Sequence, residues 1–143
     1  MSNETKGPTP TEVRVATERI MGALYPEITT IGAVSEPCSG SADFFPQPEH
    51  VGAPGWMQGG LSATVLDSFS ARLASAALGM KVVTGTFDLR YRQPVLLDGG
   101  PYAVTGTTDT PRQRTVRVTA AISAPGGKPL VEASGLFVGV ADL

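Results

Sequence analysis

The sequence of 143 residues is poor in cysteine and histidine, with one of each, Cys38 and His50. A single cysteine excludes a disulfide within the chain. With one thiol and one imidazole, a zinc site built from the usual ligands is nearly excluded. The same holds for any Ser-His-Asp or Cys-His catalytic arrangement that does not use one of these two residues. Catalysis, if there is any, must rest on carboxylate, hydroxyl, amide or backbone groups.

The chain also has little net charge and no long apolar run. Eleven Lys and Arg residues stand against thirteen Asp and Glu, and no basic cluster is present, so the chain lacks the basic face that binding to nucleic acid requires. No apolar stretch approaches the ~20 residues of a membrane span, and the N-terminal MSNETKGPTPTE is too polar for a signal peptide. We expect a cytoplasmic protein with no nucleic-acid or membrane partner.

The order of apolar and turn-forming residues predicts one domain over residues 11–143, preceded by a flexible tail over residues 1–10. Thr11 is expected to cap a short amphipathic helix that carries Val13 to Leu24 and ends before Pro26. Strands are expected over residues 28–36 and around residues 38–45. Residues 46–56, rich in Pro and Gly, are expected to form a loop without regular structure.

The most informative segment is residues 59–78, where apolar residues recur at helical spacing among Ala and Ser, up to Gly79. A helix with this composition is suited to being enclosed on most sides. Four strands follow, over residues 82–91, 102–107, 114–123 and 130–140, and we expect them to be antiparallel neighbours. In the first, alternation places Thr84 on the face of Asp88 and Arg90, opposite Phe87. These elements predict an α+β fold in which an antiparallel sheet wraps a long helix, with a sheet edge free to pair with a second copy.

Two features of this helix point to chemistry. Asp67 lies among apolar residues with no basic residue three or four positions away. It is either a base or nucleophile, or an ordinary helix Asp that is exposed or accepts hydrogen bonds from Ser68, Ser70 or a neighbouring subunit. The residues Gln58-Gly59-Gly60 open the helix, and their N–H groups are either a binding site for a carbonyl oxygen or a common weak cap.

Three segments resemble the hotdog-fold acyl-CoA thioesterases of the PaaI-like, or 4-hydroxybenzoyl-CoA thioesterase, type. QGGLSATVLD (residues 58–67) is similar to the family's His-Gly-Gly-(six residues)-Asp signature. TGTFDLRYRQPV (residues 84–95) matches a strand ending in Tyr-x-x-Pro-Val, and GKPLVEASGLFV (residues 127–138) matches a final strand with Glu-Ala-x-Gly-x-Phe. Each motif alone is common, but together they cover roughly residues 49–140 in the family's order.

The resemblance implies hydrolysis of an acyl-CoA or acyl-carrier-protein thioester, with coenzyme A present only as part of the substrate and with no cofactor. Asp67 would be the general base or nucleophile, and the N–H of Gly60, with that of Gly59, would polarise the carbonyl. Thr84 would orient the water or the carboxylate. The active site would lie between two subunits of a homodimer or a dimer of dimers, where Asp67 and Thr84 act with Gln58 and Gly60 of the partner subunit.

The chain departs from the family at Gln58, which stands in place of histidine. An amide can donate a hydrogen bond to a thioester oxygen but does not titrate near neutral pH. Hydrolysis by Asp67 is compatible with this change, whereas a mechanism that needs an imidazole is not. Two other functions therefore stay open. One is a hotdog dehydratase that pairs His50 with a carboxylate. The other is a non-catalytic protein that binds an acyl thioester or a polyketide-like ligand.

Side chains that would contact the substrate are less specific. His50 precedes the helix and either touches the substrate or is a solvated loop residue. Among several arginines, Arg92 and Arg114 are the candidates for the phosphates of coenzyme A, with exposed strand-face charges as the alternative. An acyl pocket or plain core would be formed by Trp56, Met57, Phe69 and Met80.

Overall fold

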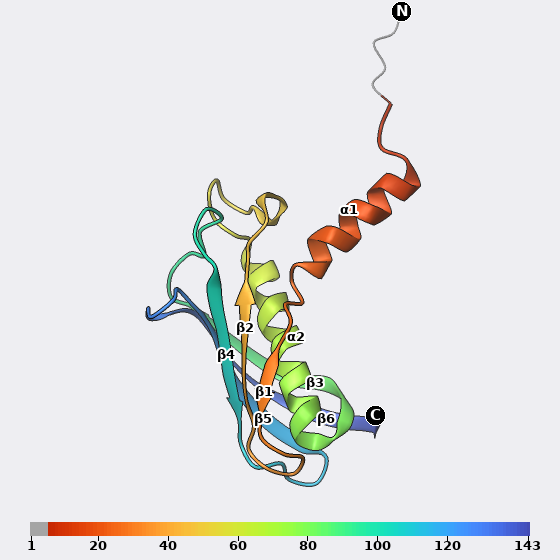
Figure 1. The fold of residues 1–143 in the computed structure, drawn as a ribbon, viewed down its shortest axis with the longest axis vertical. Coiled ribbons are helices and arrows are strands. Elements are labelled where there is room, and N and C mark those ends of the chain that lie inside the picture. The colour runs from red at the N-terminus through yellow and green to blue at the C-terminus, as the bar shows by residue number, and fades with distance from the viewer. Residues whose placement is uncertain (1–5) are drawn as a thin grey trace, which may run out of the picture.

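The computed structural model describes residues 6–143, in which a six-stranded antiparallel sheet curves around one long helix (Figure 1). In chain order the elements are α1 (Pro10–Gly22), β1 (Thr29–Ile31), β2 (Ser39–Phe44), η1 (Pro48–His50), α2 (Gly59–Leu78), β3 (Met80–Tyr91), β4 (Tyr102–Thr108), β5 (Thr115–Ser123) and β6 (Pro129–Asp142). Of the predicted tail over residues 1–10, residues 1–5 lie outside the described part, and Pro10 already belongs to α1.

The predicted central helix is confirmed as α2. Its side chains at Leu66, Phe69 and Leu73 have no exposed surface and pack against strands of the sheet. Burial of each such side chain contributes about 1.5–3 kcal/mol to the stability of the folded state. The helix ends where Gly79 adopts a left-handed conformation, with φ of 66°, and its N–H caps the carbonyl of Ser75. No helix within residues 6–143 has the length and apolarity needed to cross a membrane.

The strand order is β1-β2-β4-β5-β6-β3, so the expected pairing of all four later strands in sequence order is wrong at one step. β4, β5 and β6 are antiparallel neighbours as predicted, but β3 pairs with β6 and not with β4. The connection over residues 92–101 is too long for a tight hairpin turn. It pairs instead with the loop before α2, where Met57 donates to the carbonyl of Val95. Among residues 6–143, β3 is therefore an edge strand that pairs on one side only.

The predicted alternation of β3 is wrong at one point, because the strand contains a β-bulge. Thr84 pairs with Phe137 and Thr86 with Leu136, so Gly85 is an extra residue on the β3 side. One inserted residue shifts the alternation, so that the residues on either side of it, Thr84 and Thr86, lie on opposite faces instead of on the same one. Glycine suits the position because a Cβ there would lie 3.1 Å from the carbonyl oxygen of Leu136. Thr84 therefore shares the helix-facing side with Phe87 instead of facing outward with Asp88.

The N-terminal elements are shorter than the sequence suggests. Thr9, not Thr11, caps α1 by accepting from the N–H of Glu12, and the helix ends at Gly22. β1 covers three residues of the predicted strand over 28–36, because Gly32 and Ser35 adopt positive φ values of 124° and 71° and turn the chain. The predicted loop over residues 46–56 contains a single 3-10 turn, η1.

Candidate active site

The side chains of Asp67 and Thr84 meet between the middle of α2 and β3. Thr84 Oγ1 donates to Asp67 Oδ1 over 2.7 Å, and the Gly85 bulge is what turns this hydroxyl toward the helix. The pair lies at a hollow of about 200 Å³, lined also by Ala63, Thr64 and Phe87. Within residues 6–143 Asp67 has no ion-pair partner, and its second carboxylate oxygen accepts no hydrogen bond. This half-buried carboxylate has room to receive a proton or a ligand.

The first turn of α2 presents unused donors. The carbonyl of Gln58 accepts from Leu61 and Ser62, over 3.1 and 3.2 Å. In the part of the chain that the structure describes, the N–H groups of Gly59 and Gly60 donate to no backbone acceptor. The side chain of Gln58 is exposed and makes no capping hydrogen bond. The positive end of the helix dipole therefore carries two free N–H groups beside a free amide, an arrangement suited to an oxygen that gains negative charge.

The two groups of candidate residues lie apart within one chain. Gly60 and Asp67 are seven residues apart on the same helix, which places them on one face but about 10 Å apart along the axis. A carbonyl oxygen held at Gly60 is therefore out of reach of the Asp67 carboxylate of the same chain. The structure unites Asp67 with Thr84, and Gln58 with Gly59 and Gly60, as two separate halves.

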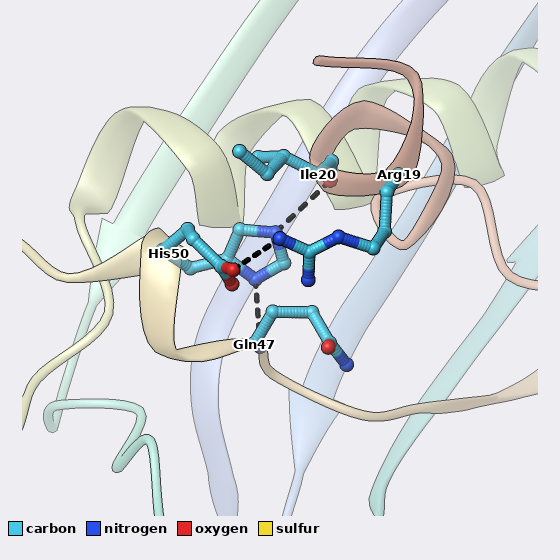
Figure 2. A network of polar contacts seen from close by, with 5 residues as sticks. Arg19, Ile20, Gln47 and His50 are labelled. Carbon is cyan, nitrogen blue, oxygen red and sulfur yellow. Dashed lines mark hydrogen bonds and ion pairs between the residues drawn. The ribbon is translucent and has the colours of Figure 1, made fainter. Parts of the chain in front are cut away.

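Both ring nitrogens of His50 are hydrogen-bonded to backbone groups, as Figure 2 shows. Its Nδ1 accepts from the N–H of Gln47 and its Nε2 donates to the carbonyl of Ile20, each over 3.0 Å. The ring is fully buried and stacks on Phe44. The expectation of a solvated side chain is wrong, and neither ring nitrogen is left for a substrate. Beside it Arg19 pairs with Glu49, whose pKa is lowered chiefly by the hydrogen bond from that guanidinium. His50 thus joins the end of α1 to the loop before α2.

The two arginines proposed for phosphate binding do not converge. Arg92 Nε donates to the carboxylate of Glu132 over 2.8 Å, and Arg114 Nε donates to the carbonyl of Gly139 over 3.0 Å. Seven residues of β6 separate these partners, which corresponds to about 20 Å along the strand. Within one chain they cannot bind a single phosphate cluster together.

The candidate acyl-pocket residues divide into two groups. Trp56 is half exposed and lines, with Met57, a cavity of about 320 Å³ beside Gly59. Phe69 has no exposed surface and belongs to the core. Sequence reasoning missed one residue at this cavity, Tyr91, whose hydroxyl donates to the carbonyl of Gly59 over 2.6 Å. Its only signal in the sequence was its place in the Tyr-x-x-Pro-Val segment.

No cluster of three or more His, Cys, Asp or Glu side chains that could hold a metal ion occurs within residues 6–143. The hydrogen-bond partner of Asp67 within these residues is the hydroxyl of Thr84, and Ala63, Thr64 and Phe87 complete the lining of its hollow. The chemistry that these residues offer is proton transfer or nucleophilic attack by a carboxylate, together with hydrogen-bond donation from a helix N-terminus.

No family model and no curated protein matches the sequence, but solved structures do match it. The chain is similar to a thioesterase family protein from Silicibacter pomeroyi, with 18% identity, a TM-score of 0.67 and coverage of 90% of this chain and 96% of that one. A thioesterase superfamily protein from Shewanella loihica shares 24% identity and a TM-score of 0.60 over 79% of this chain and 90% of that one. A hypothetical thioesterase from Streptococcus pneumoniae, crystallised with coenzyme A, shares 14% identity and a TM-score of 0.61 over 81% and 88%.

At these identities the comparisons establish the fold. An antiparallel sheet wrapped around a long helix, matched over most of the chain to thioesterase structures, is the hotdog fold. The fold predicted by the resemblance is confirmed.

Proposed function

We propose that the protein hydrolyses an acyl thioester of coenzyme A or of an acyl-carrier protein to a free acid and a thiol. The observation that carries this proposal is the half-buried Asp67 carboxylate, which Thr84 orients at an open hollow and which pairs with no cation among residues 6–143. Further support comes from similar structures described as thioesterases, one of which was crystallised with coenzyme A.

In the proposed reaction Asp67 takes a proton from water, and the water oxygen attacks the thioester carbonyl carbon. The carbonyl oxygen becomes an oxyanion that the N–H of Gly60, with that of Gly59, stabilises. The C–S bond then breaks, the carbonyl re-forms, and the thiolate takes the proton from Asp67. In the alternative with Asp67 as nucleophile, the carboxylate attacks the carbonyl carbon, the C–S bond breaks and the thiolate leaves, which gives a mixed anhydride. Water then hydrolyses the anhydride to the free acid and the Asp67 carboxylate, and the proton released goes to the thiolate. Gln58 donates a hydrogen bond to the substrate in either route.

The active site requires a second copy of the chain in this proposal. Because Gly60 and Asp67 of one chain are about 10 Å apart along α2, the carbonyl held by one chain must meet the Asp67 of its partner. β3 supplies the means, since its 12 residues form an edge of the sheet that, within the described residues, pairs only with β6. A long unpaired edge favours association, and antiparallel pairing of β3 with its copy forms a closed dimer. A dimer of two such dimers is the other assembly that the resemblance implies.

Between the alternatives, the dehydratase is the less well supported, because it needs a free imidazole. Both ring nitrogens of His50 are bonded to backbone groups and the ring is buried. No observation favours a purely ligand-binding role over hydrolysis.

The test is thiol release from short, long and aromatic acyl-CoA substrates by the wild-type protein and by Asp67→Asn. Removal of a general base lowers turnover by about 10²–10⁴-fold, and we expect that loss at an unchanged melting temperature. Asp88→Asn is the matched control, because Asp88 lies on β3 on the face opposite to Thr84, away from Asp67, and should leave turnover unchanged. Equal activity of Asp67→Asn and wild type would remove Asp67 from the mechanism. Absence of thiol release from every substrate would favour a binding protein.

A further inference from the structure

Tyr91 ends β3 at the point where that strand passes the first turn of α2. Its hydroxyl donates to the carbonyl oxygen of Gly59 over 2.6 Å. A Cβ on Gly59 would lie 3.3 Å from Cε1 and 3.4 Å from Cζ of the tyrosine ring, so the glycine admits the ring at close range. Tyr91 and Gly59 together line the cavity of about 320 Å³ that Trp56 and Met57 also border.

The bonded carbonyl belongs to a peptide unit with a special position. The carbonyl of Gly59 and the N–H of Gly60 are the two ends of one planar peptide group. A hydrogen bond accepted at the oxygen fixes the plane of that group and polarises its N–H, which then donates more strongly. This N–H has no backbone acceptor within residues 6–143. The carbonyl of Gly59 lies in the first turn of α2, so the hydroxyl adds a further hydrogen bond to the helical one and strengthens the free donor at the other end of the peptide.

We propose that Tyr91 is a positioning residue for the thioesterase reaction, holding the Gly59–Gly60 peptide so that its N–H points at the carbonyl oxygen of the substrate. The proposal rests on the proposed function and assigns to it a residue outside the Asp67 half of the site. The hydroxyl is suited to this role because it remains protonated, since partial burial raises the pKa of Tyr91. Its position at the end of the edge strand also couples the donor to the strand that would pair in the dimer.

The variant that tests this inference is Tyr91→Phe, which keeps the ring against Gly59 and removes only the donor. Loss of one hydrogen bond that strengthens in the transition state predicts a fall in kcat of roughly tenfold, with KM changed less than about twofold. Tyr25→Phe is the control, because Tyr25 is half exposed and its hydroxyl makes no hydrogen bond within the described residues. The melting temperatures of both variants should match that of the wild type.

A second measurement separates positioning from a structural role. Two unreactive analogues are compared for binding, a coenzyme A ketone that retains the carbonyl and a thioether that lacks it. The wild type should prefer the ketone, and Tyr91→Phe should lose most of that preference while binding the thioether normally. If Tyr91 has only a structural role, Tyr91→Phe should bind both analogues more weakly by the same factor, and that result would overturn the inference.

The outcomes distinguish this inference from the proposed function. If the wild type releases thiol and Tyr91→Phe does so with the same kcat and the same ketone preference, only the role of Tyr91 is wrong. If the wild type neither releases thiol nor prefers the ketone, the proposed function fails, and the role of Tyr91 fails with it.

Discussion

Asp67 and His50 are both polar side chains with apolar neighbours, but they differ in burial and in hydrogen bonding. Asp67 is half buried, receives one hydrogen bond from a side chain and lies at an open hollow. His50 has no exposed surface, and the backbone groups of Gln47 and Ile20 occupy both of its nitrogens (Figure 2). Asp67 therefore has a carboxylate oxygen free to accept a hydrogen bond, whereas both ring nitrogens of His50 are occupied.

This difference separates a residue that can do chemistry from one that holds the fold. Backbone N–H and C=O groups that are buried need partners, and His50 supplies one partner to each of two segments. Its own carbonyl also accepts from the N–H of Gln58, so the same residue holds the start of α2. Within the part of the chain that the structure describes, Asp67 bonds to no backbone group, so its removal leaves no backbone group without a partner. Substitutions should therefore affect activity at one position and stability at the other.

The largest effect on stability is expected for His50→Ala. The substitution leaves the N–H of Gln47 and the carbonyl of Ile20 without partners and opens a cavity against Phe44. Such changes cost about 3 kcal/mol in the free energy of unfolding, or roughly 10 °C in melting temperature. Urea denaturation and thermal melting measure this loss.

The control for this variant is Val51→Ala, because Val51 is the next residue and is half exposed. It should change stability by less than about 0.5 kcal/mol. Thiol release by the folded fraction of His50→Ala should stay within a few-fold of the wild type. A large loss of turnover at wild-type stability would reverse the assignment and make His50 part of the reaction.

A smaller effect, on turnover alone, is expected for Thr84→Val. Valine keeps the shape of threonine but cannot donate to Asp67, so the carboxylate loses the bond that orients it. One lost hydrogen bond corresponds to a fall in kcat of roughly tenfold. Because Thr84 is exposed in the single chain, the melting temperature should scarcely change. Thr84→Ser retains the hydroxyl and should restore most of the activity, and equal kcat values for the valine variant and wild type would leave Thr84 without a role.

Much of the central fold could be predicted because local signals and burial agree there. In α2 the apolar spacing, the glycines at its start and Gly79 at its end all indicate one helix, and the structure places it at those residues. The strand pairing could not be predicted in full. Nothing local to residues 82–91 indicates whether β3 continues to β4 or crosses to β6, because that choice depends on long-range contacts.

The candidate site was predictable in its residue types but not in its geometry. Asp67 is a candidate because a carboxylate among apolar neighbours in a helix is unusual. Its contact with Thr84 was implied only by the resemblance, since simple alternation places this hydroxyl on the far face of the strand, and the bulge at Gly85 reverses it. His50 was ambiguous because its partners at Ile20 and Gln47 are backbone groups, which carry no signature in the sequence.

The smallest effect concerns the ion pair of Arg19 and Glu49 beside His50. The hydrogen bond from Arg19 holds the pKa of Glu49 below its usual value of 4.5. A carboxyl whose folded pKa is lowered stabilises the fold above its unfolded pKa, and this contribution is lost as the pH falls through the folded value. The wild type should therefore lose a little stability below about pH 4.5 that Glu49→Gln does not lose, and the effect is small because both side chains are partly exposed to solvent.

Thermal melting of wild type and Glu49→Gln from about pH 7 to about pH 3 measures this difference. Glu18→Gln is the control, since Glu18 lies on α1 but faces Arg14 instead of Arg19. The melting temperatures of wild type and Glu49→Gln should converge as the pH falls. Those of wild type and Glu18→Gln should not converge. A difference that persists unchanged at low pH would mean that Glu49 acts through packing. The network around His50 would then depend on its backbone bonds alone, which makes the contrast with Asp67 sharper.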